Sequence, residues 1–362
     1  MLLTIITFII VLGILIIAHE FGHFIVAKKS GVKVEEFAIG FPPRLFSFKR
    51  GETTYSINLF PIGGYVKMLG ELEHSKDSRA FENQTPGKRF LISVAGVMMN
   101  LVLAWLILVI GFSIGMTPLV SDPNSIPGKR ISSEIIVADV SKGSPADSIG
   151  LEQGDLLISG KKPDGEIVNF DSAKDVSDFT SSETGQEVVI KYQRDKISNE
   201  KTVKISDSKE SPLGVSIVDR QVKRVPVYLA PTVALRELGK VVSITFQFLG
   251  NLVAGIFRAH TVSEGVGGPI AIYVYTGLAV RAGIMVLAQF VALLSINLAL
   301  INILPFPSLD GGRILFIILE KIFGRRVVRE QVESIIHTVG FALLLILIGF
   351  ITYRDILNLI HK

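Results

Sequence analysis

Two histidines and a glutamate close to the N-terminus have the residue types and the spacing of a zinc site. His19 and His23 are four residues apart, so on a helix their imidazoles lie one above the other and can bind one metal ion. Glu20 stands next to His19, where it can take a proton from a metal-bound water. This pattern therefore predicts a metal centre that carries its own general base.

The setting of these three residues favours a functional site. They lie in an apolar segment, 2–27, which as a helix is about 39 Å long and can cross a hydrocarbon core of about 30 Å. Ionisable side chains inside a membrane are costly and are usually functional. The alternative is a packing cluster in which the three side chains hydrogen-bond to neighbouring spans, and the ligand spacing makes this the weaker interpretation.

Asp310 is the predicted third ligand, because catalytic zinc sites usually have three protein ligands and one position for water. It follows Pro305 and Pro307, which end an apolar helix because proline cannot continue it. By spacing alone the better interpretation is a turn in which Asp310 caps a helix that starts near Arg313. The topology favours the ligand, because the first and third spans carry their polar groups to the same side of the membrane.

Composition narrows the class of protein. Of 362 residues, 49% are hydrophobic and only 19% are charged, whereas soluble domains carry about 25% charged residues. The chain has no cysteine and six histidines, which excludes disulfides, thiolate zinc sites and cysteine nucleophiles. The net charge of +4 and the single tryptophan give little support to nucleic-acid binding. A membrane protein is therefore expected.

Four apolar segments are long enough to span a membrane. They are residues 2–27, about 90–116, 284–304 and 335–352. The first has no basic residue before it and no small-x-small cleavage site, so we expect it to stay in the protein and not to be a signal peptide. A shorter apolar piece, 241–256, contains glutamine, glycine and asparagine and predicts a helix that lies at the membrane surface.

The distribution of charge predicts an orientation. Residues 28–90 hold 11 basic and 7 acidic residues, and residues 310–335 add five basic ones, whereas residues 119–235 hold 15 basic and 18 acidic residues. The positive-inside rule therefore places 28–90 and 310–335 in the cytoplasm and 119–235 outside.

Three parts of the chain follow from this layout. Residues 1–118 form an N-terminal membrane part that includes the cytosol-side region 28–90, residues 119–235 form a soluble insert, and residues 236–362 form a C-terminal membrane part. The core of the insert is about 130–222. Strand patterns at 134–140, 187–193 and 201–205 predict an α+β module there. In the region 28–90, strands at 45–48 and 55–59 predict a hairpin.

Two motifs together closely resemble the site-2 protease family of intramembrane zinc metalloproteases. They are HEFGH at 19–23 and NILPFPSLDGG at 302–312. Three further stretches match bacterial members of the family that have an extracytoplasmic PDZ domain, at 37–43, 61–71 and 95–100. The likeness extends over nearly the whole chain. It implies that His19, His23 and Asp310 bind Zn²⁺ and that Glu20 is the catalytic acid and base.

The resemblance also implies a fold, a reaction and a location. The fold is a polytopic α-helical membrane protein with about four transmembrane helices, an inserted α+β PDZ-like domain and a membrane-associated β-hairpin. The reaction is hydrolysis of peptide bonds within or near transmembrane segments of single-pass membrane proteins, already trimmed by another protease. Anti-sigma factors and signal-peptide remnants are the expected substrates. The location is the bacterial cytoplasmic (inner) membrane, with the PDZ-like domain outside.

Five further residues are candidates for contacts with the substrate. Gly63, Gly64 and Tyr65 match a hairpin segment that engages an extended substrate strand, although an ordinary amphipathic hairpin has the same pattern. Asn297 and Asn302 either hydrogen-bond an unwound substrate backbone or join neighbouring spans. For the PDZ-like segment, a module that binds no peptide and only gates access is the slightly better interpretation.

The sequence departs from the family at two points and leaves two rival functions. Val97 stands where the family usually has proline, and Pro42-Pro43 replaces its Gly-Pro, which puts local backbone shape in doubt but no metal ligand. A membrane scaffold with a peptide-binding PDZ domain and a non-catalytic metal site is one alternative, and a zinc or ion carrier is the other. The intact motifs argue against the scaffold, and the lack of an inverted repeat argues against the carrier. His337 is expected to pack beside the fourth span and not to bind metal.

Overall fold

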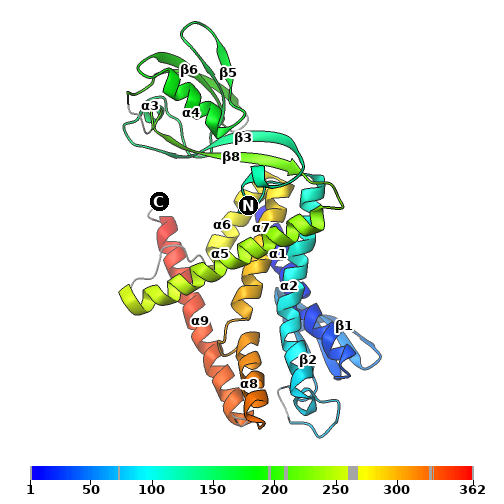
Figure 1. Cartoon of the computed structure of the whole chain (residues 1–362). Coiled ribbons are helices and arrows are strands. Elements are labelled where there is room, and N and C mark those ends of the chain that lie inside the picture. Colours follow the sequence, from blue (N-terminus) through cyan, green and yellow to red (C-terminus); the bar gives the residue numbers. More distant parts are fainter. Residues whose placement is uncertain are drawn as a thin grey trace. The chain divides into compact units, whose positions relative to one another are not determined.

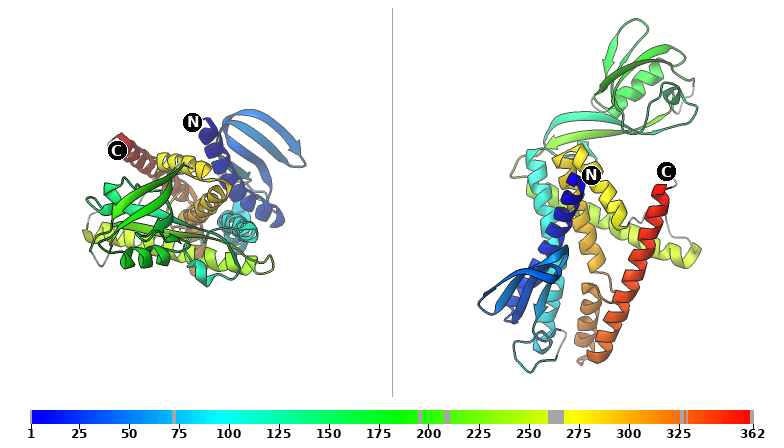
Figure 2. Two further views of the ribbon diagram at one scale, coloured as in Figure 1. Left: turned by 90° about the horizontal axis from the view of Figure 1, so that it is seen from above. Right: turned by 180° about the vertical axis from the view of Figure 1, so that it is seen from behind.

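The computed structural model describes residues 2–71, 74–194, 197–207, 211–259, 268–325, 328 and 330–360. It divides into two compact units, the first made of Met1–Gly111 and Ala230–Lys362 and the second of Phe112–Leu229. Figures 1 and 2 show that the first unit is mainly helical and that the second is built mainly of strands. The predicted insert, 119–235, lies several residues further along the chain than the second unit.

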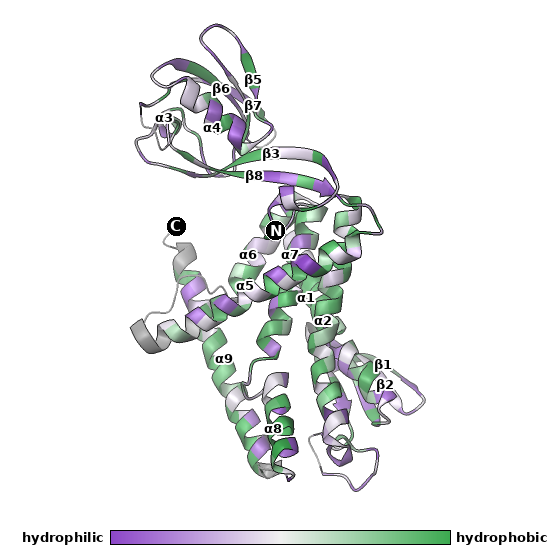
Figure 3. Ribbon diagram, in the orientation of Figure 1, coloured by the Kyte–Doolittle hydropathy of each residue, from purple (hydrophilic) through white to green (hydrophobic). Residues whose placement is uncertain are grey.

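The helices of the first unit are α1 (Leu2–Lys29), α2 (Pro86–Ile114), α5 (Ala230–Ala259), α6 (Pro269–Ala282), α7 (Ile284–Asn302), α8 (Asp310–Phe323) and α9 (Glu330–Ile360). The last three residues of α2, 112–114, belong to the second unit. In the described part of the chain, four segments are long and apolar enough to cross a membrane, in agreement with the four predicted spans. They are Leu2–Lys29, Pro86–Ile114, Ile284–Asn302 and Ile335–Leu357. Figure 3 shows their hydrophobic colour. Such uniformly apolar helices are typical of lipid-facing segments.

Helix α5 (Ala230–Ala259) contains the short apolar piece 241–256 and is longer than it at both ends. It has 30 residues and runs obliquely across α7 in Figure 1. Its location at a membrane surface stays a prediction.

Asp310 lies at the start of α8, directly after the non-helical connection from α7. Helix α7 ends at Asn302, two residues before the end of the predicted third span, and α8 begins at Asp310 with Leu309 as its cap residue. Asp310 is therefore the first residue of the helix and not the cap of one that starts near Arg313. Figures 1 and 2 show α8 alongside α9.

Strands β1 (Val34–Arg50) and β2 (Thr53–Met68) form an antiparallel pair in the first unit. The predicted hairpin strands, 45–48 and 55–59, are only the distal part of this longer pair. Residues 36–39 of β1 pair with residues 54–57 of β2 and also with residues 64–67. The two strands therefore fold into a small sheet, and the segment 64–68 pairs with β1 alone among the described residues.

The distal part of this sheet exposes many large apolar side chains, namely Phe41, Leu45, Phe46, Phe48, Ile57, Leu59 and Phe60. A patch of this kind marks an interaction surface. The predicted association with the membrane fits it and stays a prediction. The proximal part packs against α1 and α2 through a buried cluster that includes Ala27, Val34, Val66 and Ile92.

The described residues of the second unit form an antiparallel sheet with strand order β7-β6-β4-β3-β8, and β5 pairs with β4. Its elements are β3 (Lys129–Val140), α3 (Pro145–Ser148), β4 (Leu156–Lys161), β5 (Ile167–Asn169), α4 (Ala173–Ser182), β6 (Glu187–Arg194), β7 (Ile197–Lys204) and β8 (Val215–Arg224). The predicted strand 134–140 lies inside β3, and the predicted hairpin corresponds to β6 and β7. Ile135, Leu157, Phe179 and Ile190 belong to its buried core.

Candidate metal centre

The three predicted metal ligands meet at one point, although they come from helices far apart in the sequence. His19 Nε2 and His23 Nε2 on α1 are 3.2 Å apart. Asp310 Oδ2 at the start of α8 lies 3.1 Å from His19 Nε2 and 3.4 Å from His23 Nε2. The potential ligand atoms of the three residues all lie within 4.8 Å of one another.

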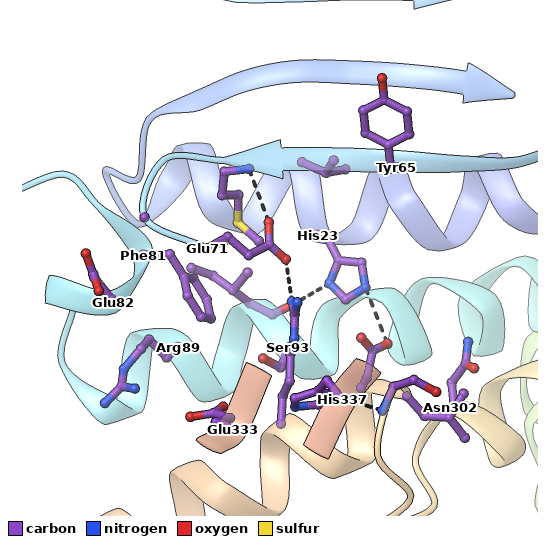
Figure 4. Close-up of a pocket in the computed structure, with 18 of the residues that line it drawn as sticks. His23, Tyr65, Glu71, Phe81, Glu82, Arg89, Ser93, Asn302, Glu333 and His337 are labelled. Atoms are coloured by element: carbon purple, nitrogen blue, oxygen red, sulfur yellow. Dashed lines mark hydrogen bonds and ion pairs between the residues drawn. The ribbon is translucent and has the colours of Figure 1, made fainter. Parts of the chain in front are cut away.

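The surroundings of His23 orient its ring. His23 Nδ1 lies 2.8 Å from the carbonyl oxygen of Ile92 on α2, so in the neutral imidazole Nδ1–H donates to that carbonyl and the Nε2 lone pair faces Asp310. Metal-binding histidines commonly donate their second N–H in this way, because the bond holds both tautomer and ring orientation. Figure 4 shows His23 with these two contacts.

These residues fit a bound cation. Asp310 Oδ2 is buried and has no hydrogen-bond donor among the described residues, and the same holds for His19 Nδ1. A carboxylate oxygen and a histidine lone pair that face each other without a hydrogen atom repel, unless a positive charge lies between them. Two imidazoles and one carboxylate are also a donor set that zinc uses in catalytic sites.

Two glycines allow α1 and α2 to approach at this point. A Cβ atom on Gly96 would lie 2.3 Å from His23 Nε2 and 2.7 Å from His19 Cε1. A Cβ atom on Gly22 would lie 2.3 Å from the carbonyl oxygen of Ala95. Small residues permit such close crossings of transmembrane helices. The segment 95–97 therefore contributes Gly96 to the centre.

The connection before α8 is also held closely. A Cβ atom on Gly311 would lie 2.1 Å from the carbonyl oxygen of Leu304, and one on Gly312 would lie 2.5 Å from that of Phe306. The backbone N–H of Ser308 donates to His337 Nδ1 at 2.9 Å. His337, which was expected only to pack, therefore holds the loop that positions Asp310.

A cavity of about 610 Å³ opens beside the three ligands. Glu20 lines it, and so do Tyr65 and Asn302. Asn302 Nδ2 lies 3.4 Å from His19 Nε2. Asn297 does not line this cavity, and its Oδ1 is buried without a hydrogen-bond partner among the described residues.

Strand β2 passes the centre on the side of Glu20. A Cβ atom on Gly64 would lie 3.4 Å from Glu20 Cγ and 3.3 Å from Ile16 Cγ2. Tyr65, Val66 and Met68 line the cavity, whereas a Cβ on Gly63 would meet the Phe41 ring. The structure therefore places Gly64 beside Glu20, puts Tyr65 in the lining of the same cavity, and leaves Gly63 outside that lining.

An ion pair that the sequence analysis missed joins β2 to α8. Arg313 Nη1 donates to Glu71 Oε1, and Glu71 Oε2 accepts the backbone N–H of Met68 at 3.2 Å. Both residues line the cavity, and Glu71 is labelled in Figure 4. The carboxylate of Glu71 raises the pKa of the Arg313 guanidinium above its ordinary value. Arg313 follows the Asp-Gly-Gly motif directly, which is the one signal that pointed to it.

The chain is similar to a known protein family over most of its length. The family model described as peptidase family M50 matches residues 7–347. A Clostridium perfringens protein named as a zinc metalloprotease is 37% identical over 343 residues, which are 95% of each chain. The zinc metalloprotease RasP of Shouchella clausii is 30% identical over 442 aligned positions, with 98% of this chain and 99% of that protein covered.

Two solved PDZ domains match a part of the chain. The PDZ domain of an SdrC-like protein from Listeria monocytogenes is 25% identical, with 26% of this chain and 94% of that domain covered at a TM-score of 0.21. The PDZ domain of an SdrC-like protein from Listeria innocua is 28% identical, with 24% and 92% covered at a TM-score of 0.20.

Proposed function

The chain belongs to peptidase family M50 and is a zinc metalloprotease of the site-2 type, and we propose that it cleaves single-pass membrane proteins within or beside their transmembrane segments. The enzyme is a multi-pass membrane protein. Its proposed substrates are anti-sigma factors already trimmed by another protease, or signal-peptide remnants. Its proposed location is the bacterial cytoplasmic membrane, with the PDZ-like module on the extracytoplasmic side.

The convergence of His19, His23 and Asp310 carries this proposal. His19 Nε2, His23 Nε2 and Asp310 Oδ2 would hold Zn²⁺, and the support for this assignment is the short distances between these atoms. Zinc supplies a Lewis acid that lowers the pKa of water toward about 7. The carbonyl of Ile92 accepts from His23 Nδ1–H and so would leave the lone pair of Nε2 available to a metal ion.

Glu20 is the proposed acid and base. It takes the proton of the attacking water and passes it to the leaving amine, and its support is its place in the lining beside both histidines and Asp310. Asn302 is a donor whose amide N–H can hydrogen-bond the carbonyl oxygen of the scissile bond as negative charge develops on it. Its support is the proximity of its Nδ2 to His19.

The segment 64–68 of β2 is the proposed substrate strand partner. A peptide bond in a transmembrane helix is shielded by helical hydrogen bonds, so the substrate must unwind before cleavage. Strand addition at an exposed edge replaces those hydrogen bonds. The support for this role is that the segment pairs with β1 alone among the described residues, and that Tyr65 lines the cavity. Asn297, which does not line the cavity, is more simply assigned to helix packing.

Cleavage of a single-pass reporter by the full-length protein in liposomes tests the proposal, together with zinc content by elemental analysis. Glu20→Gln is expected to keep about one zinc per chain and to lose at least about 100-fold in cleavage rate, because the base is removed and the ligands are not. Asp310→Asn is expected to lose both zinc and cleavage. Asp77→Asn, at a partly exposed site of the same unit, is the matched control.

Each contrary outcome points to a different function. Full cleavage by Glu20→Gln would contradict the acid and base role. Wild-type protein without zinc would favour a membrane scaffold, and zinc flux across the liposome without cleavage would favour a carrier.

A further inference from the structure

Four basic residues face one another at the open end of the β3–β8 ribbon in the second unit. Lys129 is paired across the strands with Arg224, and Arg130 is paired with Lys223. Lys129, Arg130 and Arg224 are exposed, and Lys223 is partly buried. Like charges directly opposite each other destabilise a sheet. A bound anionic group would relieve the repulsion within these two successive pairs. Figure 3 colours this end of β8 as hydrophilic.

The protein itself does not supply that partner in the described residues, because none of the four cations makes an ion pair there. Arg130 Nη1 donates only to the backbone carbonyl of Asp171, at 3.4 Å. Three acidic residues on or near the ribbon have other partners. Asp122 accepts the N–H of Asn124, Glu134 lies 3.6 Å from Arg220, and Asp219 accepts the hydroxyl of Ser133.

The position of these cations follows from hydrogen bonds to the end of a membrane span. Val225 N–H donates to the carbonyl of Phe112 at 2.8 Å, and Lys223 and Met116 exchange two backbone hydrogen bonds of 3.1 Å. Phe112 lies in the last turn of α2, which ends at Ile114 and is one of the four candidate spans. The cations therefore lie within a few residues of the point where the chain leaves the hydrocarbon, which is the level of lipid headgroups.

Exposed apolar side chains accompany the cations. Ile131 next to Arg130 is 53% exposed, and Val227 and Tyr228, just beyond β8, are 71% and 80% exposed. Tyrosine and tryptophan are enriched at membrane interfaces, where the ring enters the apolar boundary and the polar tip stays in the headgroup layer. Basic residues combined with exposed apolar ones are the composition of surfaces that lie on anionic membranes.

We propose that this surface binds the phosphate headgroups of anionic phospholipids. We name it the interfacial collar and define it by Lys129, Arg130, Ile131, Lys223, Arg224, Val227 and Tyr228. The headgroup phosphates neutralise the two cross-strand pairs, and the apolar members enter the boundary of the acyl chains. The collar ties the base of the ribbon to the membrane, and it does so whether or not the peptidase is active.

Native mass spectrometry of the full-length protein in detergent tests the collar, with phosphatidylglycerol and phosphatidylcholine added at equal concentration. Each basic residue at a membrane surface strengthens binding by roughly fivefold. The variant K129Q/R130Q/K223Q/R224Q is therefore expected to bind phosphatidylglycerol at least about tenfold more weakly, with phosphatidylcholine binding unchanged. The matched control, K142Q/K161Q/K174Q/K201Q, removes the same charge from exposed lysines elsewhere in the unit and is expected to behave like the wild type.

Three outcomes would overturn the proposal. They are equal phosphatidylglycerol binding by the collar variant and the wild type, an equal loss in the control variant, and displacement of the lipid by the same concentration of inorganic phosphate. If the collar variant folds poorly, the salt dependence of lipid binding by the wild-type protein tests the proposal. Its phosphatidylglycerol binding is expected to fall steeply as salt rises from about 0.05 to 0.5 M, because exposed charges are screened, and salt-independent binding would contradict the collar.

Discussion

Gly96 has no side chain at the point where α2 passes His19 and His23, the two histidines proposed to bind zinc. In Gly96→Ala the new Cβ would lie 2.3 Å from His23 Nε2, so the ring must turn away from its place beside Asp310. Disturbing the orientation of a metal ligand typically costs 10–100-fold in metal affinity. We therefore expect Gly96→Ala to bind zinc at least about tenfold more weakly, measured by competition with a chromogenic chelator.

Gly13→Ala is the matched control for this prediction. Gly13 lies on α1, and its Cβ would have no neighbouring atom within 4 Å, so zinc affinity should not change. Wild-type zinc affinity in Gly96→Ala would show that the two helices can separate at this crossing without loss of the site.

The Glu71–Arg313 pair joins the end of β2 to α8. These two elements must keep a fixed relative position for the proposed cleavage. Glu71 follows β2, whose segment 64–68 is the proposed substrate strand partner, and Arg313 lies one helical turn after Asp310 on α8. Breaking the pair is expected to displace the substrate strand relative to the metal, and an error of about 1 Å in substrate position can cost 100-fold in rate. We expect Glu71→Gln and Arg313→Gln each to lose about tenfold in kcat/KM while zinc content stays unchanged.

A double-mutant cycle separates this coupling from two independent defects. Because the two side chains act on each other, the double variant should be no slower than either single variant. The pair Arg79–Glu52, with side chains 50% and 36% exposed, is the control, since exposed ion pairs contribute about 0–1 kcal/mol. Additive losses in the cycle would assign Glu71 and Arg313 separate roles.

Because the molecule divides into two compact units, we expect a change that destabilises one unit to leave the stability of the other unchanged. In the second unit, Arg194 Nη2 and Nε bind both oxygens of Asp155 at 2.6 and 2.7 Å, and the Asp155 side chain is only 2% exposed. Arg194→Gln leaves a buried carboxylate without its cation, which we expect to cost about 3 kcal/mol. Hydrogen exchange measured by mass spectrometry should rise across 130–222, while zinc content and exchange in α1 and α7 stay unchanged.

Lys162→Gln provides the comparison within the same unit. Its ion pair with Glu166 lies on the surface, with the glutamate side chain 58% exposed, so hydrogen exchange in this unit should stay close to that of the wild type. If Arg194→Gln also raised exchange in α1 or α7, the two units would unfold as one.

Much of this molecule was predictable from local patterns. Four long apolar runs predicted the four candidate spans, because a helix must be continuously apolar to lie in lipid. The spacing of His19 and His23 placed both on one helix face. The strand patterns at 134–140 and 187–205 found β3, β6 and β7, since alternation along a half-buried strand is visible in sequence.

Other features depended on tertiary contacts that leave no periodic signal. The hairpin appeared in the sequence as two short strands, whereas β1 and β2 are longer because residues 36–39 pair on two sides. Glu71 and Arg313 are 242 residues apart, and His337 reaches Ser308 from another helix. The contact of Gly96 with the histidine rings is of the same kind. Residue types and spacing therefore determined which chemistry is possible, and only the packing of distant helices decided which side chains share the cavity, because each of those contacts depends on how far one helix can approach another.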